Sequence, residues 1–561
     1  MRIGLVCGAA VAALLSGPAG ASVVISTAPT SNMSCSGGVC TATAANAVLN
    51  VSDLQSMLAS GNASVVSGSV ASDIGVETAL GWASANRLTL DAFHGIAFDA
   101  PVSVTGGGGL TIITNDGGTN GDFSFASAAF ADFWDLSSSL TINGTAYTLE
   151  NDLGTLASAI AASPSGAFAL ARNYDASVNG IYHQAPIMTE LTGSFEGLGH
   201  AISNLAIHAP NSKRAALFDM TGFGAVLRDL TLASATIKGG DAGTLVGESA
   251  QSAVIQCAAS GSVTGIGRIG GLVGSDTGGS VLRSHSSVTI HGTGTGGTAS
   301  GGGLVGYMDY NQQQSAGIFN SYATGNVTSF EAGGLAGHWL GATIDQSYAT
   351  GTVRAPDGGA AGGLVGTDMG TVTRSFATGA VSGGSEAAVG GVAGGSFSGG
   401  INLSFATGSV QGGDHAKVGG LLGYGFATIY DTYATGSVKG GPFSDNGGLV
   451  GLSAQDGAVT VSVSYSTGAV RGSDPSHTGG FEGAHDTGFD NSIDYWDVDT
   501  SKHGAKHGIG DCIQHRCSKG IKGLTTSELK SALPAGFDPA VWGQSAGINS
   551  GYPYLLANPP Q

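Results

Sequence analysis

The sequence predicts an all-β protein, a right-handed parallel β-helix (solenoid) with short helices near its N-terminal region and in a C-terminal cap. Three observations predict this fold. A pair of glycine-rich motifs recurs every 27 to 32 residues through the second half of the 561-residue chain. Apolar residues come in short bursts without the spacing of an amphipathic helix. Glycines, 98 in all, bound these bursts, and a fixed period of this length indicates stacked units that are each too small to bury a core alone.

The first motif is Gly-Gly-Leu-Val-Gly, as at Gly302 to Gly306, and its central apolar residue recurs once per period. Each of these residues would stack inward on the equivalent residue of the next coil, about 4.8 Å away. We therefore expect a structural column, which we call the leucine column: Leu245, Leu272, Leu304, Leu335, Leu364, Val392, Leu421, Leu449 and Phe481. One period would be one coil with two or three short strands, and the chain would form about fifteen coils.

The second motif is Ser-aromatic-Ala-Thr-Gly, as at Ser321 to Gly325, and it keeps the same period. Its aromatic residues predict a second structural column, the aromatic column: Tyr322, Tyr348, Phe376, Phe405, Tyr433 and Tyr465. Because Tyr and Phe exchange at this position, we expect that the hydroxyl group is not required. Two interpretations stay open, a buried or half-buried stack with a structural role and an exposed binding ladder.

The motif pair resembles the GLUG motif, which occurs in bacterial surface proteins of the filamentous-haemagglutinin type, in adhesins and in some immunoglobulin A peptidases. The resemblance covers residues 193–498, with degenerate copies near Cys257 and Ser284. It implies a secreted or cell-surface protein of a Gram-negative bacterium, or a periplasmic one. Residues 22–192 resemble the same class by style rather than by a strict motif, which implies less regular coils that continue the solenoid.

The elements follow in chain order. Residues 1–21 have the features of a secretory signal peptide, and no later window is apolar enough to span a membrane. A short helix is expected from Ser52, as its cap, to a stop at Gly61, and a second from Leu153 to Ala162. Short strands are expected in between: Ala63 to Val66, Leu88 to Leu90, Ile96 to Phe98, Val102 to Val104 and Leu110 to Ile113.

Residues 499–561 are expected to form a cap over the open end of the solenoid, with a helix that begins after Thr525 or Thr526. Phe537, Trp542 and Tyr552 give this segment an apolar content that the repeats lack. The role of its insert from Cys512 to Cys517 does not follow from the sequence.

Five cysteines remain after the signal peptide, and two pairs share the same spacing, Cys35 with Cys40 and Cys512 with Cys517. In an exported protein each pair predicts a local disulfide, with a metal site as the alternative. Cys257 stands in a serine position of a degenerate repeat, where we expect a small buried residue.

The amino-acid composition limits the kinds of molecule that the protein can bind. The chain carries 39 acidic against 20 basic residues, a net charge of −19, so nucleic acid and anionic membranes are poor partners. We expect no cofactor and no metal: His503, His507 and Asp499 lie near one another in sequence, but a glycine-rich loop does not fix them on one face. Turn residues are the expected role of Asn115, Asp116 and Asp122.

The sequence contains no pattern that predicts a catalytic site. We expect a non-enzymatic, adhesin-like surface or matrix protein whose rigid solenoid presents variable turns to a glycan or to another cell-surface ligand. The ligand and the oligomeric state do not follow from the sequence. The alternative is a polysaccharide lyase, hydrolase or epimerase with a site assembled across coils. Stacked threonines such as Thr324 and Thr350 also admit ice or crystal binding, but they lack Thr-x-Thr pairs.

Overall fold

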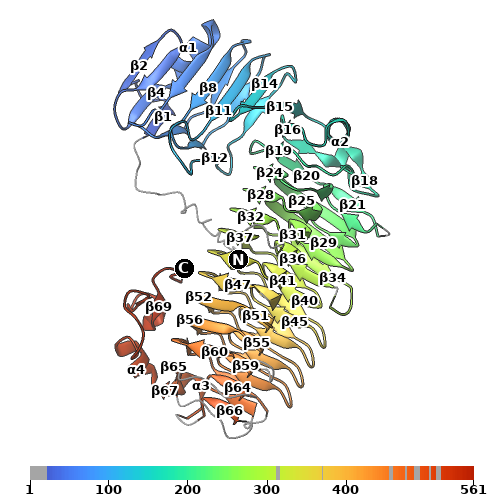
Figure 1. Ribbon diagram of the computed structural model, residues 1–561, viewed down its shortest axis with the longest axis vertical. Coiled ribbons are helices and arrows are strands. Elements are labelled where there is room, and N and C mark those ends of the chain that lie inside the picture. The colour runs from blue at the N-terminus through green and yellow to red at the C-terminus, as the bar shows by residue number, and fades with distance from the viewer. Residues whose placement is uncertain are drawn as a thin grey trace, which may run out of the picture. The chain divides into compact units, whose positions relative to one another are not determined.

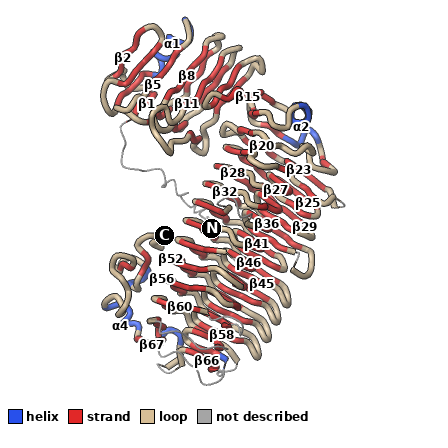
Figure 2. The backbone as a smooth tube through the Cα atoms, in the orientation of Figure 1, coloured by secondary structure: helices blue, strands red, loops and turns tan. Residues whose placement is uncertain are grey.

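The computed structural model describes residues 22–210, 212–297, 299–310, 316–368, 370–453, 459–473, 477–485, 493–504, 507–512 and 520–560. Its fold is a parallel β-solenoid of about 17 turns with a few short helices, which confirms the predicted fold class (Figures 1 and 2). The predicted signal peptide lies outside the described residues. The chain divides into two compact units. Unit 1 comprises Met1–Asn151, Ala167–Arg172 and Leu198–His200, and unit 2 comprises Asp152–Gly166, Asn173–Gly197 and Ala201–Gln561.

Unit 1 is built from three groups of paired strands around one apolar core. The first sheet has the order β12 (Phe123–Phe125), β9 (Ile96–Phe98), β6 (Asp73–Val76), β1 (Ser22–Ser26) and β4 (Ala47–Asn50). The second has the order β13 (Ala131–Phe133), β10 (Val102–Val104) and β7 (Leu80–Trp82). The third group contains β2 (Met33–Ser36), β3 (Val39–Ala42), β5 (Ala63–Val66), β8 (Arg87–Asp91), β11 (Gly109–Ile113), β14 (Ser139–Ile142), β15 (Thr145–Glu150) and β16 (Ala167–Leu170).

Parallel register carries like side chains onto like side chains in this unit. Leu88, Leu110 and Leu140 are register partners in three successive strands, and each is at most 1% exposed. Each successive coil therefore buries the apolar face that its neighbour would otherwise expose.

Two antiparallel hairpins interrupt the parallel pairing of unit 1. β2 and β3 turn through Gly37 and Gly38, and β14 and β15 turn through Asn143 and Gly144, all four residues with positive φ. Two successive left-handed residues form the tight hairpin turn whose twist suits the flanking strands. In the first hairpin a disulfide joins the directly opposed Cys35 and Cys40, as the sequence predicted. The corresponding prediction for Cys512 and Cys517 lies outside the described side chains.

One coil of unit 2 contains five short strands rather than the two or three expected. The coil from Gly317 to Leu340 contains β37 (Gly317–Phe319), β38 (Tyr322–Ala323), β39 (Val327–Thr328), β40 (Glu331–Gly333) and β41 (Ala336–Leu340). Left-handed Asn320 (φ 49°) separates β37 from β38. The turn at Asn320, which contains no glycine, therefore separates two strands in a stretch whose sequence predicts one strand.

Two continuous parallel sheets run through unit 2 (Figure 1). One has the order β22 (Arg214–Ala215), β26 (Asp241–Ala242), β30 (Arg268–Gly270), β35 (Ser300–Gly302), β40, β45 (Ala360–Gly362), β50 (Ala388–Gly390), β54 (Lys417–Gly419), β58 (Asp445–Gly447) and β63 (Thr478–Gly479). The other has the order β23 (Phe218–Thr221), β27 (Val246–Ala250), β31 (Val273–Thr277), β36 (Val305–Asp309), β41, β46 (Val365–Asp368), β51 (Ala393–Ser396), β55 (Leu422–Gly425), β59 (Val450–Ser453), β64 (Glu482–His485) and β66 (Ile509–Cys512).

Longer strands also occur on the remaining face of unit 2. Its ladders include β25 (Thr231–Gly239), β29 (Ala258–Gly265), β52 (Gly400–Ala406) and β56 (Thr428–Ala434). The last ladder continues through β61 (Tyr465–Ser466) and β65 (Asp494–Asp497) to β67 (Ile521–Leu524).

The helices follow from local capping. α1 (Val51–Ser60) begins one residue earlier than expected, because the side chain of Asn50, not Ser52, accepts from the backbone N–H groups of Ser52 and Asp53. α2 (Leu153–Ala162) has the expected bounds and is capped by Asp152. α4 (Thr526–Ser531) begins with a capping box between Thr525 and Glu528. None of the helices in the described part of the chain has the length and apolar character needed to cross a membrane.

Candidate functional site

The leucine column lies at a sharp corner between the two continuous sheets of unit 2. Its nine residues are each at most 1% exposed, and Leu304 stands between β35 and β36 as the example. Glycine is required beside it, because a Cβ on Gly302 would lie 2.0 Å from the carbonyl oxygen of Val305. The motif therefore combines a buried apolar residue with a close approach of two backbones.

The aromatic column is a continuous stack of rings on one side of unit 2. Neighbouring rings from Tyr322 to Tyr465 lie 4.7–5.2 Å apart with interplanar angles of at most 8°. His285 extends the stack by one ring, 4.8 Å from Tyr322. Because each ring within the stack has a neighbour on both faces, the column presents ring edges, not ring faces, to its surroundings.

Exposure of the aromatic column changes along its length, and all six of its rings are half-buried or buried, as in the first of the two interpretations left open by the sequence. His285 is exposed, and Tyr322 and Tyr348 are half-buried. Phe376, Phe405, Tyr433 and Tyr465 are at most 7% exposed, because they pack with the C-terminal residues Leu529, Phe537, Trp542, Tyr552 and Leu555.

The C-terminal segment lies along the aromatic column, whereas we had expected it to cover the end of the solenoid. Trp542 Nε1 donates a hydrogen bond to Asp431 Oδ1 (2.8 Å). Asn558 Nδ2 donates to the carbonyl oxygens of Ser375 (3.2 Å) and Leu403 (3.1 Å), far back in the chain. The physical reason is that the stack of rings forms an apolar stripe on the outside of the coils, and this stripe is buried by the segment.

One hydroxyl of the aromatic column is used, contrary to our expectation. Tyr465 Oη donates to the carbonyl oxygen of Pro553 (2.5 Å) and accepts from Asn549 Nδ2 (2.8 Å). The sequence did not indicate this role, because Tyr and Phe exchange between repeats and the partners of the Tyr465 hydroxyl belong to the C-terminal segment.

The residue two positions before each aromatic is left-handed, a feature that the sequence did not reveal. φ at these six non-glycine positions is 44–55°. They are Asn320, Gln346, Arg374, Leu403, Asp431 and Val463. Leu403 and Val463 pack against the C-terminal segment, whereas Asn320 and Gln346 are exposed. Of these four residues, the two that the C-terminal segment covers are apolar, and the two that are exposed are polar.

A second series of left-handed turn residues is exposed, and we call it the turn column: Gly358, Glu386, His415 and Phe443. These residues occupy the same turn of four successive coils, and all are left-handed, with φ of 56–68°. Their backbones are linked coil to coil: Gly358 N donates to Ser385 O (2.8 Å), and Glu386 N donates to Asp414 O (2.7 Å). One backbone geometry therefore carries a glycine and three chemically different side chains, of which Phe443 is 67% exposed.

Two of the buried carboxyl groups of unit 2 have strongly raised pKa values. Asp276 accepts from Ser249 Oγ (2.7 Å), which also bonds to Ser252 Oγ (2.6 Å), and burial raises the pKa of Asp276 to about 7. Asp368 accepts from Gly370 N (2.7 Å) and from Ser396 Oγ (3.4 Å), and burial raises its pKa to about 8. Both are at most 2% exposed, so their polar atoms serve the interior of the coils.

The histidines near the C-terminus do not assemble a metal site among the residues that the structure describes. His503 Nε2 lies 3.3 Å from the carbonyl oxygen of Val470. No group of three or more His, Cys, Asp or Glu side chains within the described ranges could hold a metal ion. Asp497 instead caps the short helix α3 (Val498–Ser501), with its side chain accepting from Asp499 N and Thr500 N. Cys257 is buried, and its thiol is free.

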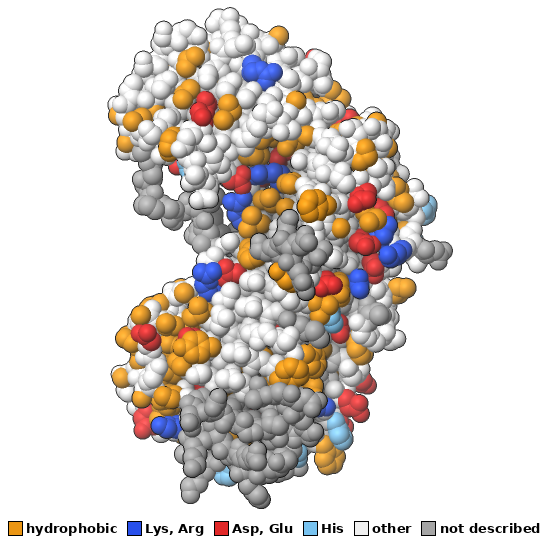
Figure 3. Space-filling view, in the orientation of Figure 1, with side chains coloured by type: hydrophobic (Ala, Val, Ile, Leu, Met, Phe, Trp, Pro, Cys, Tyr) orange, Lys and Arg blue, Asp and Glu red, His pale blue; other side chains and the backbone are white. Residues whose placement is uncertain are grey.

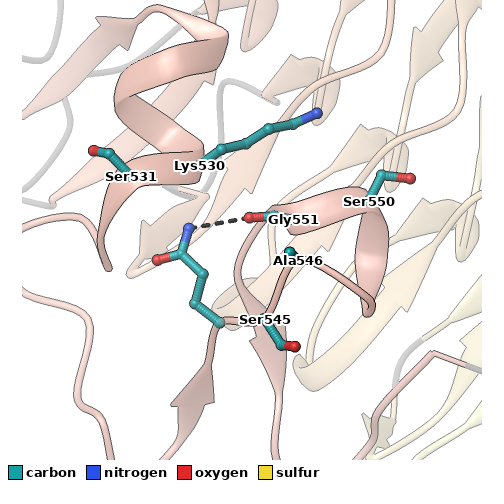
Figure 4. Close-up of a pocket in the computed structure, with 7 residues that line it drawn as sticks. Lys530, Ser531, Ser545, Ala546, Ser550 and Gly551 are labelled. Atoms are coloured by element: carbon teal, nitrogen blue, oxygen red, sulfur yellow. Dashed lines mark hydrogen bonds between the residues drawn. The ribbon is translucent and has the colours of Figure 1, made fainter.

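Two shallow pockets lie in unit 2. One, of about 410 Å³, is formed within the C-terminal segment by Lys530, Ser531, Gln544, Ser545, Ala546, Ser550 and Gly551 (Figure 4). Gln544 closes one side of it by donating to the carbonyl oxygen of Gly551 (3.1 Å). The other pocket, of about 480 Å³, includes Lys213, Asp241 and Ile266. Both pockets are open to the surface, so neither encloses a substrate between an acid and a base. Charged side chains are sparse over the face shown in Figure 3.

Comparison with known proteins gives partial likenesses. No known family model matches the chain, so the resemblance to GLUG proteins stays a prediction. Over 87 residues, 15% of this chain, the sequence is 42% identical to halomucin of Haloquadratum walsbyi (strain DSM 16790 / HBSQ001), and the match spans 1% of halomucin.

Two solved structures match the chain with low scores. The structure of an IgA1 protease matches 56% of this chain and 23% of its own chain, with a TM-score of 0.34 and 18% identity. A putative immunoglobulin A1 protease from Bacteroides ovatus matches 74% of this chain and 92% of its own, with a TM-score of 0.26 and 16% identity. At these scores the likeness does not bear on activity.

Proposed function

We propose that this protein is an exported, non-enzymatic, adhesin-like surface or matrix protein, which binds glycans or cell-surface ligands through repeated exposed turns. The turn column is the observation that carries this proposal. Four successive coils keep one backbone conformation and one pattern of hydrogen bonds while the exposed side chain changes from glycine to Glu386, His415 and Phe443. Such a series of fixed positions suits a ligand with repeating units, because many weak contacts add by avidity.

The buried acids support a binding role over catalysis. A general acid or base must come within hydrogen-bond reach of the atom that it protonates or deprotonates. Asp276 and Asp368, whose pKa values are raised by burial, are enclosed by their own coils and bonded to serines and to the backbone. The half-buried Glu248 lies in an ion-pair cluster with Arg214 (2.7 Å) and Lys213 (3.5 Å).

The disulfide of unit 1 supports export. Disulfides persist in oxidising compartments and are rare in the cytosol of most organisms. The pairing of Cys35 with Cys40 therefore agrees with the signal peptide predicted from residues 1–21.

The test is whether the protein retains a polysaccharide without changing it chemically. The purified protein is incubated with a panel of bacterial, plant and host polysaccharides, and both retained polymer and new reducing or unsaturated ends are measured. We expect retention with no new ends, and we expect Glu386→Ser, His415→Ser and Phe443→Ser together to reduce retention at least about tenfold, since several contacts of an avid interaction are removed at once. New ends would show an enzyme and overturn the proposal.

A control variant separates turn chemistry from exposed apolar surface in general. Val178→Ser, Phe223→Ser and Ile266→Ser change three residues of unit 2 that are 61–75% exposed but lie outside the turn column. Retention should be unchanged in this variant. An equal loss in both triple variants would mean that the turn column has no special role.

A further inference from the structure

A cluster of polar and aromatic side chains in unit 1 lies apart from the turn column. Trp134 follows β13 and is 58% exposed, whereas Trp82, Trp339, Trp496 and Trp542 are at most 6% exposed. Burying an indole normally stabilises a protein, so an exposed tryptophan held in one orientation is a candidate contact for a ligand.

Two side chains, Arg172 and Asp132, lie next to Trp134. The guanidinium carbon of Arg172 lies 4.8 Å from the centroid of the indole ring. Burial raises the pKa of Asp132, and the neighbouring side chains of Arg172, Trp134 and Ser103 offset part of this rise, which places the Asp132 carboxyl close to them. Ser103 and Asp132 are register partners on β10 and β13, so the parallel ladder itself places the acceptor beside the ring.

A buried histidine backs the cluster. His200 Nε2 lies 3.0 Å from the carbonyl oxygen of Ala131 and 3.8 Å from Asp132 Oδ1. Its ring stacks on Phe130, with centroids 5.4 Å apart. Burial lowers the pKa of His200 to about 4, so this ring is neutral at physiological pH and donates through Nε2 to the backbone. The ring next to Asp132 is therefore uncharged and buried.

We propose that Trp134, Arg172 and Asp132 form a binding site for a neutral hexopyranose unit of a glycan. The C–H groups of one face of such a sugar make an apolar patch that packs on an indole ring. The guanidinium N–H groups donate and the carboxyl oxygens accept, which matches a pair of neighbouring sugar hydroxyls. The guanidinium of Arg172 lies over the Trp134 ring, yet Trp134 is 58% exposed and keeps surface for a ligand, whereas rings within the aromatic column have neighbours on both faces.

The charges of the site and of the whole chain favour a neutral sugar over an acidic one. The cluster places one cation, Arg172, beside one carboxyl group, Asp132, and the two offset each other. The chain as a whole carries a net charge of −19, which repels polyanions. The net negative charge would repel a polymer of uronic acids. Within the site, the charge of Arg172, the single cation, is already offset by Asp132.

The test uses the fluorescence of the full-length protein. Because the other four tryptophans are buried, a soluble quencher such as acrylamide reports mainly on Trp134. Neutral oligosaccharides of glucose, galactose and mannose are added in turn, with oligogalacturonate as the acidic comparison. We expect at least one neutral oligosaccharide to lower the quenching constant about twofold or more, and the acid to have no effect.

Variants assign the effect to the cluster. Arg172→Leu and Asp132→Asn should each weaken binding of that oligosaccharide about tenfold, measured by calorimetry, while Trp134→Ala should abolish it. Phe223→Ala, which removes an aromatic side chain that is 68% exposed, serves as the control and should bind as wild type does. Binding that is unchanged in Trp134→Ala, protection by the acid alone, or no protection by any neutral oligosaccharide would overturn the inference.

The outcome is separable from that of the proposed function. The site lies in unit 1 and does not depend on the turn column of unit 2. Polysaccharide retention that survives Trp134→Ala but is lost in the triple variant of the turn column would remove this site and leave the proposed function standing. The reverse pattern would leave the site standing and remove the role of the turn column.

Discussion

At the scale of single residues, the left-handed turn positions hold chemically different side chains, and packing by another segment offsets the backbone strain of some of them. Gln346 and Val463 occupy equivalent left-handed positions, with φ of 48° and 55°. Such a conformation is unfavourable for bulky and β-branched residues. Val463 is tolerated where the C-terminal segment packs against it, and the exposed Gln346 has no such compensation from that segment.

Gln346→Val should therefore destabilise unit 2. The expected loss is about 1–2 kcal/mol, because a β-branched residue is forced into the left-handed region without any new packing. Gln346→Gly is the matched control and should keep or slightly raise the melting temperature, since glycine adopts this φ freely. Equal melting temperatures for the valine and glycine variants would contradict the assigned backbone strain.

Two buried carboxyl groups, Asp276 and Asp368, predict a pH dependence of stability. A carboxyl whose pKa is raised on folding stabilises the folded state while it is protonated in both states, and this contribution is lost as pH rises through the folded pKa. With folded pKa values of about 7 for Asp276 and about 8 for Asp368, stability should fall from about pH 4 to above pH 8.

Asp368→Asn should flatten that dependence. An amide at this position accepts from Gly370 N as the carboxyl does and never ionises. We expect its melting temperature to match that of wild type at acidic pH and to exceed it at alkaline pH. Parallel melting curves for the two proteins across the whole pH range would show that Asp368 does not titrate in this range.

At the scale of elements, the coil and its cover depend on each other. The aromatic column forms from local repeats, but four of its rings are buried only because the C-terminal segment returns to them. The same segment uses Asp431 as an acceptor for Trp542 and the carbonyl oxygen of Leu403 as an acceptor for Asn558. The last coils and the C-terminal segment should therefore unfold together.

Trp542→Ala tests this coupling. Trp542 is 1% exposed, and truncation of a buried tryptophan costs about 3–5 kcal/mol. We expect a lower melting temperature and faster proteolytic cleavage within residues 520–560. Trp134→Ala, which removes the exposed tryptophan, is the matched control and should change neither. Resistance to protease equal to that of wild type would mean that the segment is held without Trp542.

At the scale of the whole molecule, low charge density and a net negative charge limit the partners. Only 11% of residues are charged, and acids outnumber bases 39 to 20. Long-range attraction to polyanions is therefore absent, and contacts must come from short-range packing and hydrogen bonds. This agrees with a ligand that is neutral and repetitive.

Salt dependence follows from this balance. Retention of a neutral polysaccharide should stay constant from about 0.05 to about 0.5 M salt, because screening changes only charge interactions. Any retention of an acidic polysaccharide should instead increase with salt, as repulsion is screened. Retention that weakens steeply with salt would indicate a basic binding surface and contradict the proposed mode of binding.

The sequence by itself determined the period, the fold class and the local elements. Glycine-bounded bursts predict short strands, and the bounds of α2 and the start of α4 follow from capping residues a few positions away. The disulfide of Cys35 and Cys40 follows from their spacing in the chain. All of these depend on interactions between neighbours in sequence or between identical repeats, which a pattern records directly.

Tertiary structure alone decided which parts of the chain cover one another. The hydrogen bond from Asn558 to Ser375 joins residues 183 positions apart, and no periodicity encodes it. The contact of Trp134 with Arg172 likewise depends on the stacking of coils in unit 1. The exposure of the aromatic column, the left-handed turns and the tryptophan site all arise from such pairings, because burial and backbone strain depend on neighbours that are distant in sequence and specific to one place in the fold.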